Sequence, residues 1–429
     1  MSSSAAPLHD LLIAIPTVIL ACRAGAGLLR RAGQPPVVGE IAIGIVLGPS
    51  LLGWIWPSAE HWLLPEAVLP YIETLGNIGL LAFLLLAGLE LNLSAIRGHG
   101  RTAVAVGQMS IALPLALGAL LAFGMYKTLA PKGVGMLPFV LFIALAMSIT
   151  AFPVLARILT DHGLYRTSVG TLTMTCAAVG DVTAWCLLAA VVAVATGGSP
   201  TGALVTAALT AAFLVVMVYV VRPLLARWAA RAERGSDSVV LVVLFSGLCL
   251  SALATEAIGV HALFGAFVFG AVCPRGSRTI ERSAARTRAF TMPVLLPLFF
   301  VSTGLRADLA LLVDNPVLWL WFLAVLAVAV LGKWGGSTGA ARMAGWPWRG
   351  AMSIGVLMNC RGLTELVVLD IGLQLGVIGP DLFTVLVLMA LLTTAVTTPA
   401  LTWFRRSARD SDLEPAAQAR RHRQVTGAS

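Results

Sequence analysis

A single acidic side chain stands near the middle of a long apolar segment. Asp181 lies within residues 167–196, which carry no other charged side chain and are long enough to cross a bilayer as one helix. A carboxylate at that depth costs roughly 2.5–3.5 kcal/mol on insertion scales, so it is rarely retained unless it is paired, hydrated or used. A carboxylate binds either a proton or, through its oxygens, a hard cation, and each displaces the other. We therefore interpret Asp181 as a shared proton and cation carrier, with a purely structural buried pair as the alternative.

A single lysine also lies inside an apolar segment. Lys333, in the sequence VLGKWGGSTG, is predicted near the middle of its helix. An ammonium group at that depth needs a partner, and Asp181 is the predicted one. The alternative is a salt bridge that only holds the helices together. The two interpretations overlap, because a bridge that an incoming cation breaks is also a switch.

Polar residues interrupt two further apolar segments. The segment ALAMSITAFPVLARIL carries Ser148, Thr150 and Pro153, and the segment GVLMNCRGLTELVVL carries Asn359, Arg361 and Glu365. Interruptions at matching places in two halves of a transporter indicate a binding site near the midplane. A simple proline kink is the alternative for the first segment.

The two interruptions suggest different roles for their side chains. Hydroxyls and freed carbonyls suit Na⁺ or K⁺, so Ser148 and Thr150 are predicted cation ligands, unless they only bond back to their own helix. Half-helix ends carry partial charges that a charged pair compensates, so we expect Arg361 and Glu365, with Asn359, to support the second interruption rather than bind the ion. No structural metal site is expected.

The composition describes the frame around these residues. The chain has 429 residues, of which 58% are hydrophobic and 11% charged, against about 25% charged in soluble proteins. Repeated apolar runs of about 20 residues predict an all-α polytopic membrane protein. The net charge of +9 comes from connectors and the tail, so it indicates lipid contact and not nucleic acid. The cysteines lie in apolar segments without metal-ligand spacing and are predicted to pack as small apolar residues.

Thirteen membrane spans are predicted. They cover residues 8–29, 37–56, 71–92, 102–126, 135–160, 167–196, 201–226, 237–257, 259–274, 289–306, 315–343, 350–373 and 380–404. Spans 1–6 and 8–13 form two sets of six joined by span 7, and a displacement of seven spans inverts orientation. The sets are therefore predicted to be inverted repeats.

The connectors predict the orientation. Those after even-numbered spans carry only Lys127, Lys132 and Arg306. Those after odd-numbered spans are rich in arginine: Arg30, Arg31, Arg97, Arg101, Arg166, Arg227, Arg231, Arg234, Arg275, Arg278, Arg282, Arg286, Arg288, Arg342, Arg349, Arg405 and Arg406. By the positive-inside rule the C-terminus is cytoplasmic and the N-terminus outside, in a cell membrane. The N-terminal sequence lacks the basic region of a cleaved signal peptide, so the first span is expected to be retained.

The predicted domain organisation is simple. Residues 1–404 form a membrane transporter domain, and residues 405–429 form a short disordered cytoplasmic tail. The tail has no GxGxxG or P-loop pattern, so no nucleotide-binding domain and no cofactor are expected.

Seven further segments are distinctive as a set. In chain order they are QPPVVGEIAIGIVLGPSLLG, LLAFLLLAGLEL, SITAFPVLARIL, AAVGDVTAW, TEAIGVHALFGAFVFGAVCP, LPLFFVSTGLRADL and LMNCRGLTELVVLDIG. Together they resemble the monovalent cation:proton antiporter-2 family, which includes Kef-type proteins and plant cation/H⁺ exchangers. The resemblance covers about residues 8–404. It implies a homodimer in which each protomer has a dimerisation domain and a core domain built on two crossed, broken helices, spans 5 and 12. It also implies an elevator-like cycle.

The resemblance also implies residue roles. Asp181 matches the ion-carrying aspartate of the family, Lys333 its basic residue in span 11, and Thr150 the first broken helix. One position departs from the pattern: Gly180 stands where relatives carry a second acid or an asparagine. This departure leaves the stoichiometry and the ion selectivity open.

The expected function is exchange of Na⁺ or K⁺ for H⁺ by alternating access, serving pH homeostasis, and not an enzymatic activity. An alternative is a Na⁺-coupled symporter of an organic anion on the same fold. A third is an intramembrane enzyme, for which no HExxH motif and no second partner aspartate stands out.

Overall fold

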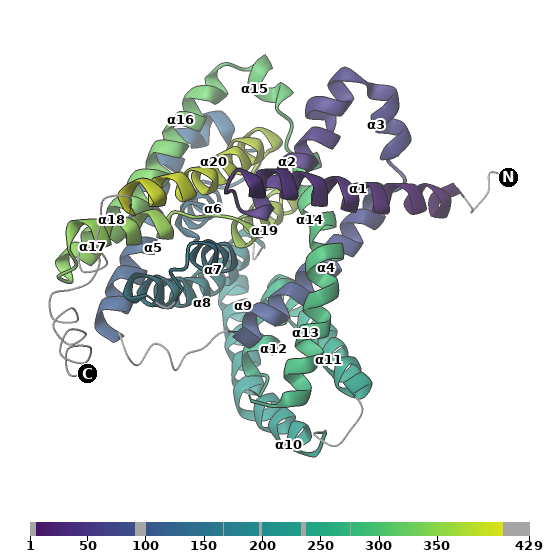
Figure 1. Ribbon diagram of the computed structural model, residues 1–429, viewed down its shortest axis with the longest axis vertical. Coiled ribbons are helices and arrows are strands. Elements are labelled where there is room, and N and C mark those ends of the chain that lie inside the picture. Colours follow the sequence, from purple (N-terminus) through teal and green to yellow (C-terminus); the bar gives the residue numbers. More distant parts are fainter. Residues whose placement is uncertain are drawn as a thin grey trace. The chain divides into compact units, whose positions relative to one another are not determined.

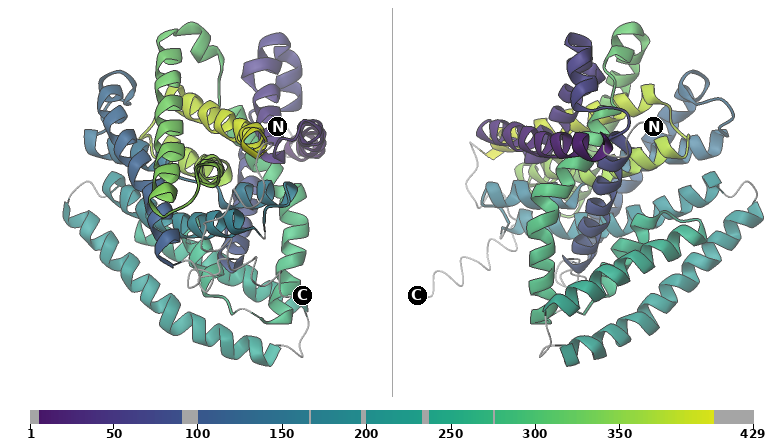
Figure 2. Two further views of the ribbon diagram at one scale, coloured as in Figure 1. Left: turned by 60° about the vertical axis from the view of Figure 1, so that its left-hand side comes forward. Right: turned by 90° about the vertical axis from the view of Figure 1, so that its right-hand side faces the viewer.

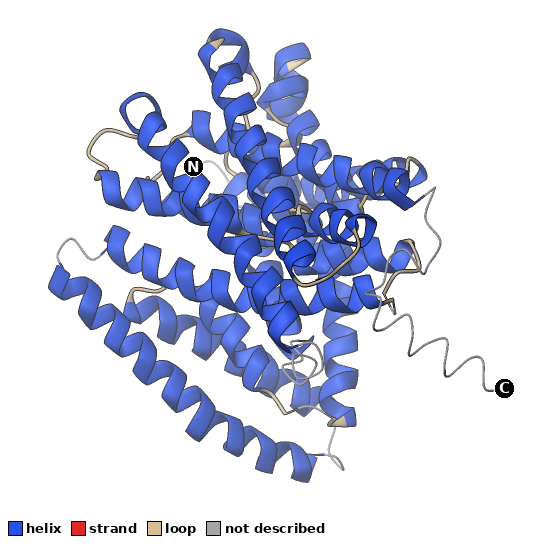
Figure 3. Cartoon of the chain, turned by 90° about the vertical axis from the view of Figure 1, so that its left-hand side faces the viewer, coloured by secondary structure: helices blue, strands red, loops and turns tan. Residues whose placement is uncertain are grey.

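The computed structural model describes residues 6–90, 100–165, 167–196, 200–232, 237–274 and 276–405, and within these ranges every regular element is a helix (Figure 3). Helices satisfy all their backbone hydrogen bonds internally, which a segment in hydrocarbon requires. The tail was predicted as residues 405–429; Arg405 is the last residue of the helix Pro380–Arg405, and residues 406–429 lie outside the described residues. Arg97, Arg166, Arg234 and Arg275 of the predicted connectors also lie outside them.

The exact count of thirteen spans is not confirmed. Eleven helices in the described residues are long and apolar enough to cross a bilayer, and the bent pair Trp348–Met358 and Leu363–Gln374 raises this number to twelve. The predicted ninth span is the short apolar helix Ala262–Val272. Its 11 residues reach about 16 Å, roughly half the thickness of a hydrocarbon core.

The chain divides into two compact units. The first comprises Met1–Leu28, Gly39–Leu91 and Ala189–Asp308, and the second Leu29–Val38, Asn92–Leu188 and Leu309–Ser429. The first unit thus holds predicted spans 1–3 and 7–10, and the second holds spans 4–6 and 11–13. Each unit takes three spans from each predicted repeat, and span 7 joins the first unit.

The first unit contains predominantly the following helices, in which η marks a π-helical turn: α1 (Ala6–Arg31), α2 (Pro36–Leu47), η1 (Pro49–Gly53), α3 (Pro57–Leu63), α4 (Leu69–Glu90), α9 (Pro200–Val216), η3 (Met217–Val221), α10 (Arg222–Ala232), α11 (Asp237–Ile258), α12 (Ala262–Val272), α13 (Arg278–Phe290), η4 (Thr291–Leu295) and α14 (Leu296–Leu305). The elements α9, η3 and α10 follow one another as one continuous long helix (Figure 2). Only 6% of the apolar stretch within Leu204–Arg231 is buried inside the protein.

Close helix contacts hold the first unit together. Helix α4 packs against α12 (Figure 1) at two glycines: a Cβ on Gly88 would lie 2.3 Å from the Phe267 carbonyl oxygen, and one on Gly270 would lie 2.2 Å from the Leu85 carbonyl oxygen. Small residues are the usual means of close helix approach in membranes. A second apolar cluster joins α1, α4 and α14 through Val18, Ile72 and Val301.

The second unit holds the interrupted helices. Its elements are α5 (Gly100–Leu129), α6 (Met136–Ser148), α7 (Phe152–Asp161), α8 (Ser168–Thr196), α15 (Ala310–Asp314), α16 (Val317–Val330), η5 (Leu331–Gly335), α17 (Gly336–Met343), α18 (Trp348–Met358), α19 (Leu363–Gln374) and α20 (Pro380–Arg405). Both predicted interruptions occur, between α6 and α7 and between α18 and α19. Buried residues from α5, α7, α8, α17 and α18 form the core around them.

Candidate functional site

The first interruption is a short extended segment. Helix α6 ends at Ser148, and the backbone at Ile149 and Ala151 is extended before α7 begins at Phe152. Pro153 lies in the first turn of α7, where its missing N–H removes no helical hydrogen bond and its ring favours a helix start. The proline therefore opens a new helix here instead of only kinking a continuous one.

The second interruption crosses the first. Helices α18 and α19 meet at a bend of 40°. The Ala151 N–H donates to the Cys360 carbonyl oxygen at 3.2 Å, and the Thr150 hydroxyl donates to the Met358 carbonyl oxygen at 3.1 Å. Gly362 allows the close approach, because a Cβ there would lie 2.6 Å from Val154 Cγ2. The two broken helices are therefore bonded to each other at their breaks.

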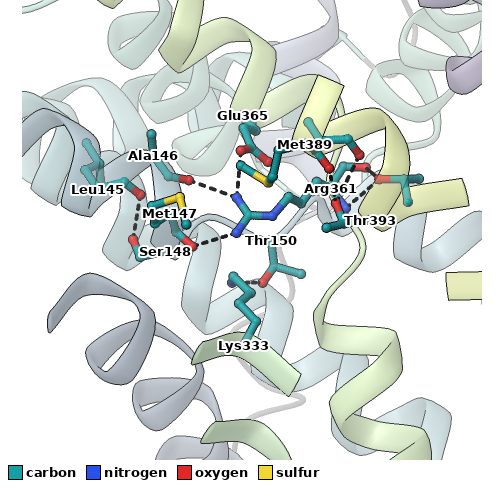
Figure 4. Close-up of polar contacts among 12 residues, drawn as sticks. Leu145, Ala146, Met147, Ser148, Thr150, Lys333, Arg361, Glu365, Met389 and Thr393 are labelled. Carbon is teal, nitrogen blue, oxygen red and sulfur yellow. Dashed lines mark hydrogen bonds and ion pairs between the residues drawn. The ribbon is translucent and has the colours of Figure 1, made fainter. Parts of the chain in front are cut away.

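The positively charged side chain of Arg361 lies where the two broken helices cross (Figure 4). Its fully buried guanidinium donates to the carbonyl oxygens of Ala146 at 3.0 Å and Met147 at 2.8 Å, and to Glu365 Oε1 at 2.6 Å. Carbonyls at the end of a helix lack helical partners and carry partial negative charge. Arg361 thus satisfies the end of α6, and Glu365, in the first turn of α19, balances its charge.

A threonine from another helix fixes the backbone at Arg361. The Arg361 N–H donates to Thr394 Oγ1 at 2.9 Å, and that hydroxyl donates to the Arg361 carbonyl oxygen at 2.7 Å. The sequence analysis missed Thr394. Its signal was present in the run of threonines inside the apolar segment 380–404, at positions 393, 394, 397 and 398.

Lys333 reaches the first interruption. It lies in η5, its side chain is fully buried, and its ammonium group donates to the Thr150 hydroxyl. The predicted partner was Asp181. The two side chains interact electrostatically, but no ion pair of 4.0 Å or less joins them in the described part of the chain. Thr150 lies between α6 and α7, so its hydroxyl donates to the other broken helix and not to its own, as a helical threonine does.

Asp181 projects from α8 with an incomplete set of partners. Its side chain is buried, and its Oδ1 atom accepts no hydrogen bond from any described residue. It lies within electrostatic reach of Lys333 and Cys360. Asn359 stands in the sequence between Met358 and Cys360, and its side-chain amide oxygen is likewise buried and accepts no hydrogen bond from the described residues.

Ser148 differs from Thr150. Its hydroxyl donates to the Leu145 carbonyl oxygen at 2.7 Å within α6, which is the back-bonding alternative raised by the sequence. Its oxygen lone pairs are still able to accept. The structure thus joins Lys333 to Thr150 and Arg361 to Glu365 by hydrogen bonds. Asp181 interacts electrostatically with Lys333.

Two broken helices that cross at a buried charged site, within a multi-pass helical bundle, define a secondary transporter of the membrane. The transmembrane sodium/hydrogen exchanger family model matches residues 17–406. The chain belongs to this family, which confirms the class that the resemblance implied.

Individual relatives agree. The Na(+)/H(+) antiporter NhaS4 of Synechocystis sp. is 41% identical over 394 residues, which cover 91% of this chain and 96% of the relative. Cation/H(+) antiporter 20 of Arabidopsis thaliana is 38% identical over 413 residues (93% and 49%), and K(+)/H(+) antiporter 1 of Saccharomyces cerevisiae is 32% identical over 409 (92% and 46%). The chain spans about half the length of these last two proteins.

A solved structure is similar in fold. The sodium proton antiporter MjNhaP1 from Methanocaldococcus jannaschii superimposes with a TM-score of 0.66, over 92% of this chain and 97% of that one. At 14% identity, the similarity concerns the fold.

Proposed function

We propose that this protein is a secondary active antiporter that exchanges a monovalent cation, Na⁺ or K⁺, for H⁺ by alternating access. Family membership and relatives named as Na⁺/H⁺ and K⁺/H⁺ antiporters support the exchange reaction. The alternative of a Na⁺-coupled symporter is not supported by these relatives. Their names also describe transporters, not enzymes.

Asp181 is the proposed shared carrier. The observation behind this role is that its buried carboxylate keeps one oxygen without a hydrogen-bond donor, within electrostatic reach of the crossed interruptions. A proton or a cation bound at this oxygen relieves the cost of the buried charge, and only one of them binds at a time. Opening of the site to alternate sides of the membrane then exchanges one for the other.

The remaining residues assist this exchange. Lys333 supplies a positive charge that favours the ionised carboxylate when no cation is bound. The hydroxyl oxygens of Thr150 and Ser148 are proposed cation ligands beside the crossing. The proposed role of the other three residues is to stabilise the second interruption: Arg361, Glu365 and Asn359. The transported ions are substrates, and no cofactor is proposed.

The multi-pass chain resides in a membrane, and we assign it to the cell membrane with its N-terminus outside and its C-terminus in the cytoplasm. We also propose a homodimer as the working assembly. The arginine distribution supports the orientation, and the family resemblance supports the dimer.

An assay in proteoliposomes tests the proposal. The internal pH is measured while Na⁺, K⁺ and Li⁺ are added in turn. The wild-type protein is expected to release trapped protons when Na⁺ or K⁺ is added. Asp181→Asn is expected to fold and to lose exchange, because an amide keeps the shape but carries no proton. Asp161→Asn is the matched control, since that acid is about half exposed and pairs with the exposed Arg157. Exchange in Asp181→Asn at the wild-type rate would remove Asp181 from the mechanism.

A further inference from the structure

Asn359 lies where the two broken helices cross. It caps the end of α18, and its own N–H bonds to the Val356 carbonyl oxygen at 3.2 Å. The residues on either side are fixed: the Met358 carbonyl oxygen accepts from Thr150 Oγ1, and the Cys360 carbonyl oxygen accepts from the Ala151 N–H. The Asn359 backbone therefore runs directly alongside Thr150 and Ala151.

The side-chain amide oxygen of Asn359 has no hydrogen-bond donor among the described residues. Asn359 is 6% exposed, and its Oδ1 atom is buried. A buried polar atom left without a partner costs about 1–3 kcal/mol, so such atoms call for an explanation. The same holds for Asp181 Oδ1, the carrier oxygen.

Two neighbouring residues relate Asp181 to the break that carries Asn359. Asp181 is within electrostatic reach of the Cys360 thiol, which immediately follows Asn359, and of Lys333, which bonds to Thr150. Asp181 on α8 is therefore within electrostatic reach of the residue next to Asn359. Each of the two side chains has a buried oxygen that accepts no hydrogen bond from the described residues.

A monovalent cation entering this site loses its water. It then needs several oxygen ligands, and one carboxylate oxygen does not replace a hydration shell. Carboxylate, amide and backbone carbonyl oxygens are the ligands that hard cations prefer, and unwound backbone in transporters supplies such ligands to Na⁺.

We infer that Asn359 Oδ1 is a direct ligand of the transported cation and sets its binding affinity. This inference rests on the proposed antiport function and adds a contact to the supporting role of the residue. A neutral amide oxygen fills a coordination position without adding charge, so a single carboxylate still balances a single monovalent ion.

Two substitutions separate a ligand from a structural amide. Asn359→Ala removes the oxygen, and Asn359→Asp keeps an oxygen of the same reach but removes the NH₂ donor. If the oxygen binds the cation, Asn359→Ala raises the KM for the cation by at least about tenfold, since loss of even an outer partner of a metal ligand costs 10–100-fold. Asn359→Asp then keeps the KM near or below the wild-type value. If the NH₂ group only held the fold, both variants would fail alike.

The assay is cation-driven proton release from proteoliposomes, with Na⁺ and K⁺ titrated separately at one pH. A second readout is the rise in Tm of the detergent-purified protein on adding NaCl or KCl in place of choline chloride. Ser353→Ala is the matched control, because its hydroxyl lies on the same helix and is already bonded to the Arg349 carbonyl oxygen at 2.9 Å.

Each outcome decides the inference. A wild-type KM in Asn359→Ala overturns it, and so does a KM in Asn359→Asp that rises as much as in the alanine variant. If Asn359→Ala does not fold, the aspartate variant decides alone, and failure of both to fold assigns a structural role and overturns the ligand. Absence of exchange in the wild type would instead count against the antiport function itself, while a salt-dependent Tm that Asn359→Ala loses and Asn359→Asp keeps would still support the ligand.

Discussion

The buried ammonium group of Lys333 donates its hydrogen bond to the hydroxyl of Thr150, and that hydroxyl donates onward to the carbonyl oxygen of Met358. The positive charge is thereby attached to the crossing of the broken helices. The positive charge of Lys333 acts on Asp181 electrostatically. If the proposed cation ligands Asp181 and Thr150 are correct, the cation competes with Lys333 for the Thr150 hydroxyl.

Removal of the Lys333 charge is expected to change the pH dependence of exchange. In Lys333→Met the Asp181 carboxylate loses a nearby positive charge, so its protonated form is favoured and a higher pH is needed to release the proton. The pH of half-maximal exchange should move upward, as measured in proteoliposomes over a pH series. Thr150→Val separates the hydrogen bond from the charge, because it keeps the ammonium group and removes its acceptor. An unchanged pH profile in Lys333→Met would show that Lys333 and Asp181 act independently.

The Arg361–Glu365 pair is expected to be essential for stability. Arg361→Met leaves a fully buried carboxylate and two unpaired carbonyls, and breaking such a pair costs about 3–5 kcal/mol. The surface pair Arg157–Asp161 has the same spacing along its helix and is about half exposed, so Arg157→Met should cost less than about 1 kcal/mol. Thermal unfolding in detergent compares the two variants. Equal shifts in Tm would mean that burial of the pair does not matter.

The two ends of the chain are expected on opposite sides of the membrane. In a variant whose six native cysteines are replaced, a cysteine at Ser3 should react with an impermeant maleimide from outside, and one at Ser411 only after lysis. Labelling of both ends from one side would refute an odd number of spans.

Helix α8 carries a single carboxylate, Asp181, and this favours one-for-one exchange. If Lys333 stays charged throughout, one H⁺ leaves for each cation and no net charge moves. If Lys333 also releases its proton, two protons move, and a potential of 100 mV then acts with about 2.3 kcal/mol per charge. We expect an imposed potential at equal pH to drive no net cation flux. Net cation flux under that condition would establish voltage-sensitive exchange, and the proposed role of Asp181 would not change.

The sequence alone predicted the buried charges better than their contacts. Asp181 and Lys333 stand out because an ionisable group is costly in any apolar segment, whatever surrounds it. The choice of Thr150 as the partner of Lys333 depends on side-chain reach between helices, which no local pattern encodes. Arg361 was predicted to compensate a helix end, but its carbonyl partners at Ala146 and Met147 carry no signal in the sequence, since every residue has a carbonyl.

The helical architecture was predictable from hydropathy, while its finer boundaries were not. Both interruptions lie where the polar residues predicted them. The count of spans depends on the helix Ala262–Val272, which the predicted range 259–274 made longer. His261 caps that helix by accepting a hydrogen bond from the Leu263 N–H, so the helix begins only after it.

The contact between Arg361 and the end of α6 has a consequence for biogenesis. Its partners lie 214 and 215 residues earlier in the chain, so α6 enters the bilayer long before Arg361 is synthesised. Until then, the last carbonyls of α6 must rely on water, lipid headgroups or a chaperone. The nascent protein therefore passes through a stage in which its first half is inserted but unfinished. A product truncated between the two halves would lack Arg361, so these carbonyls of α6 would keep no guanidinium donor.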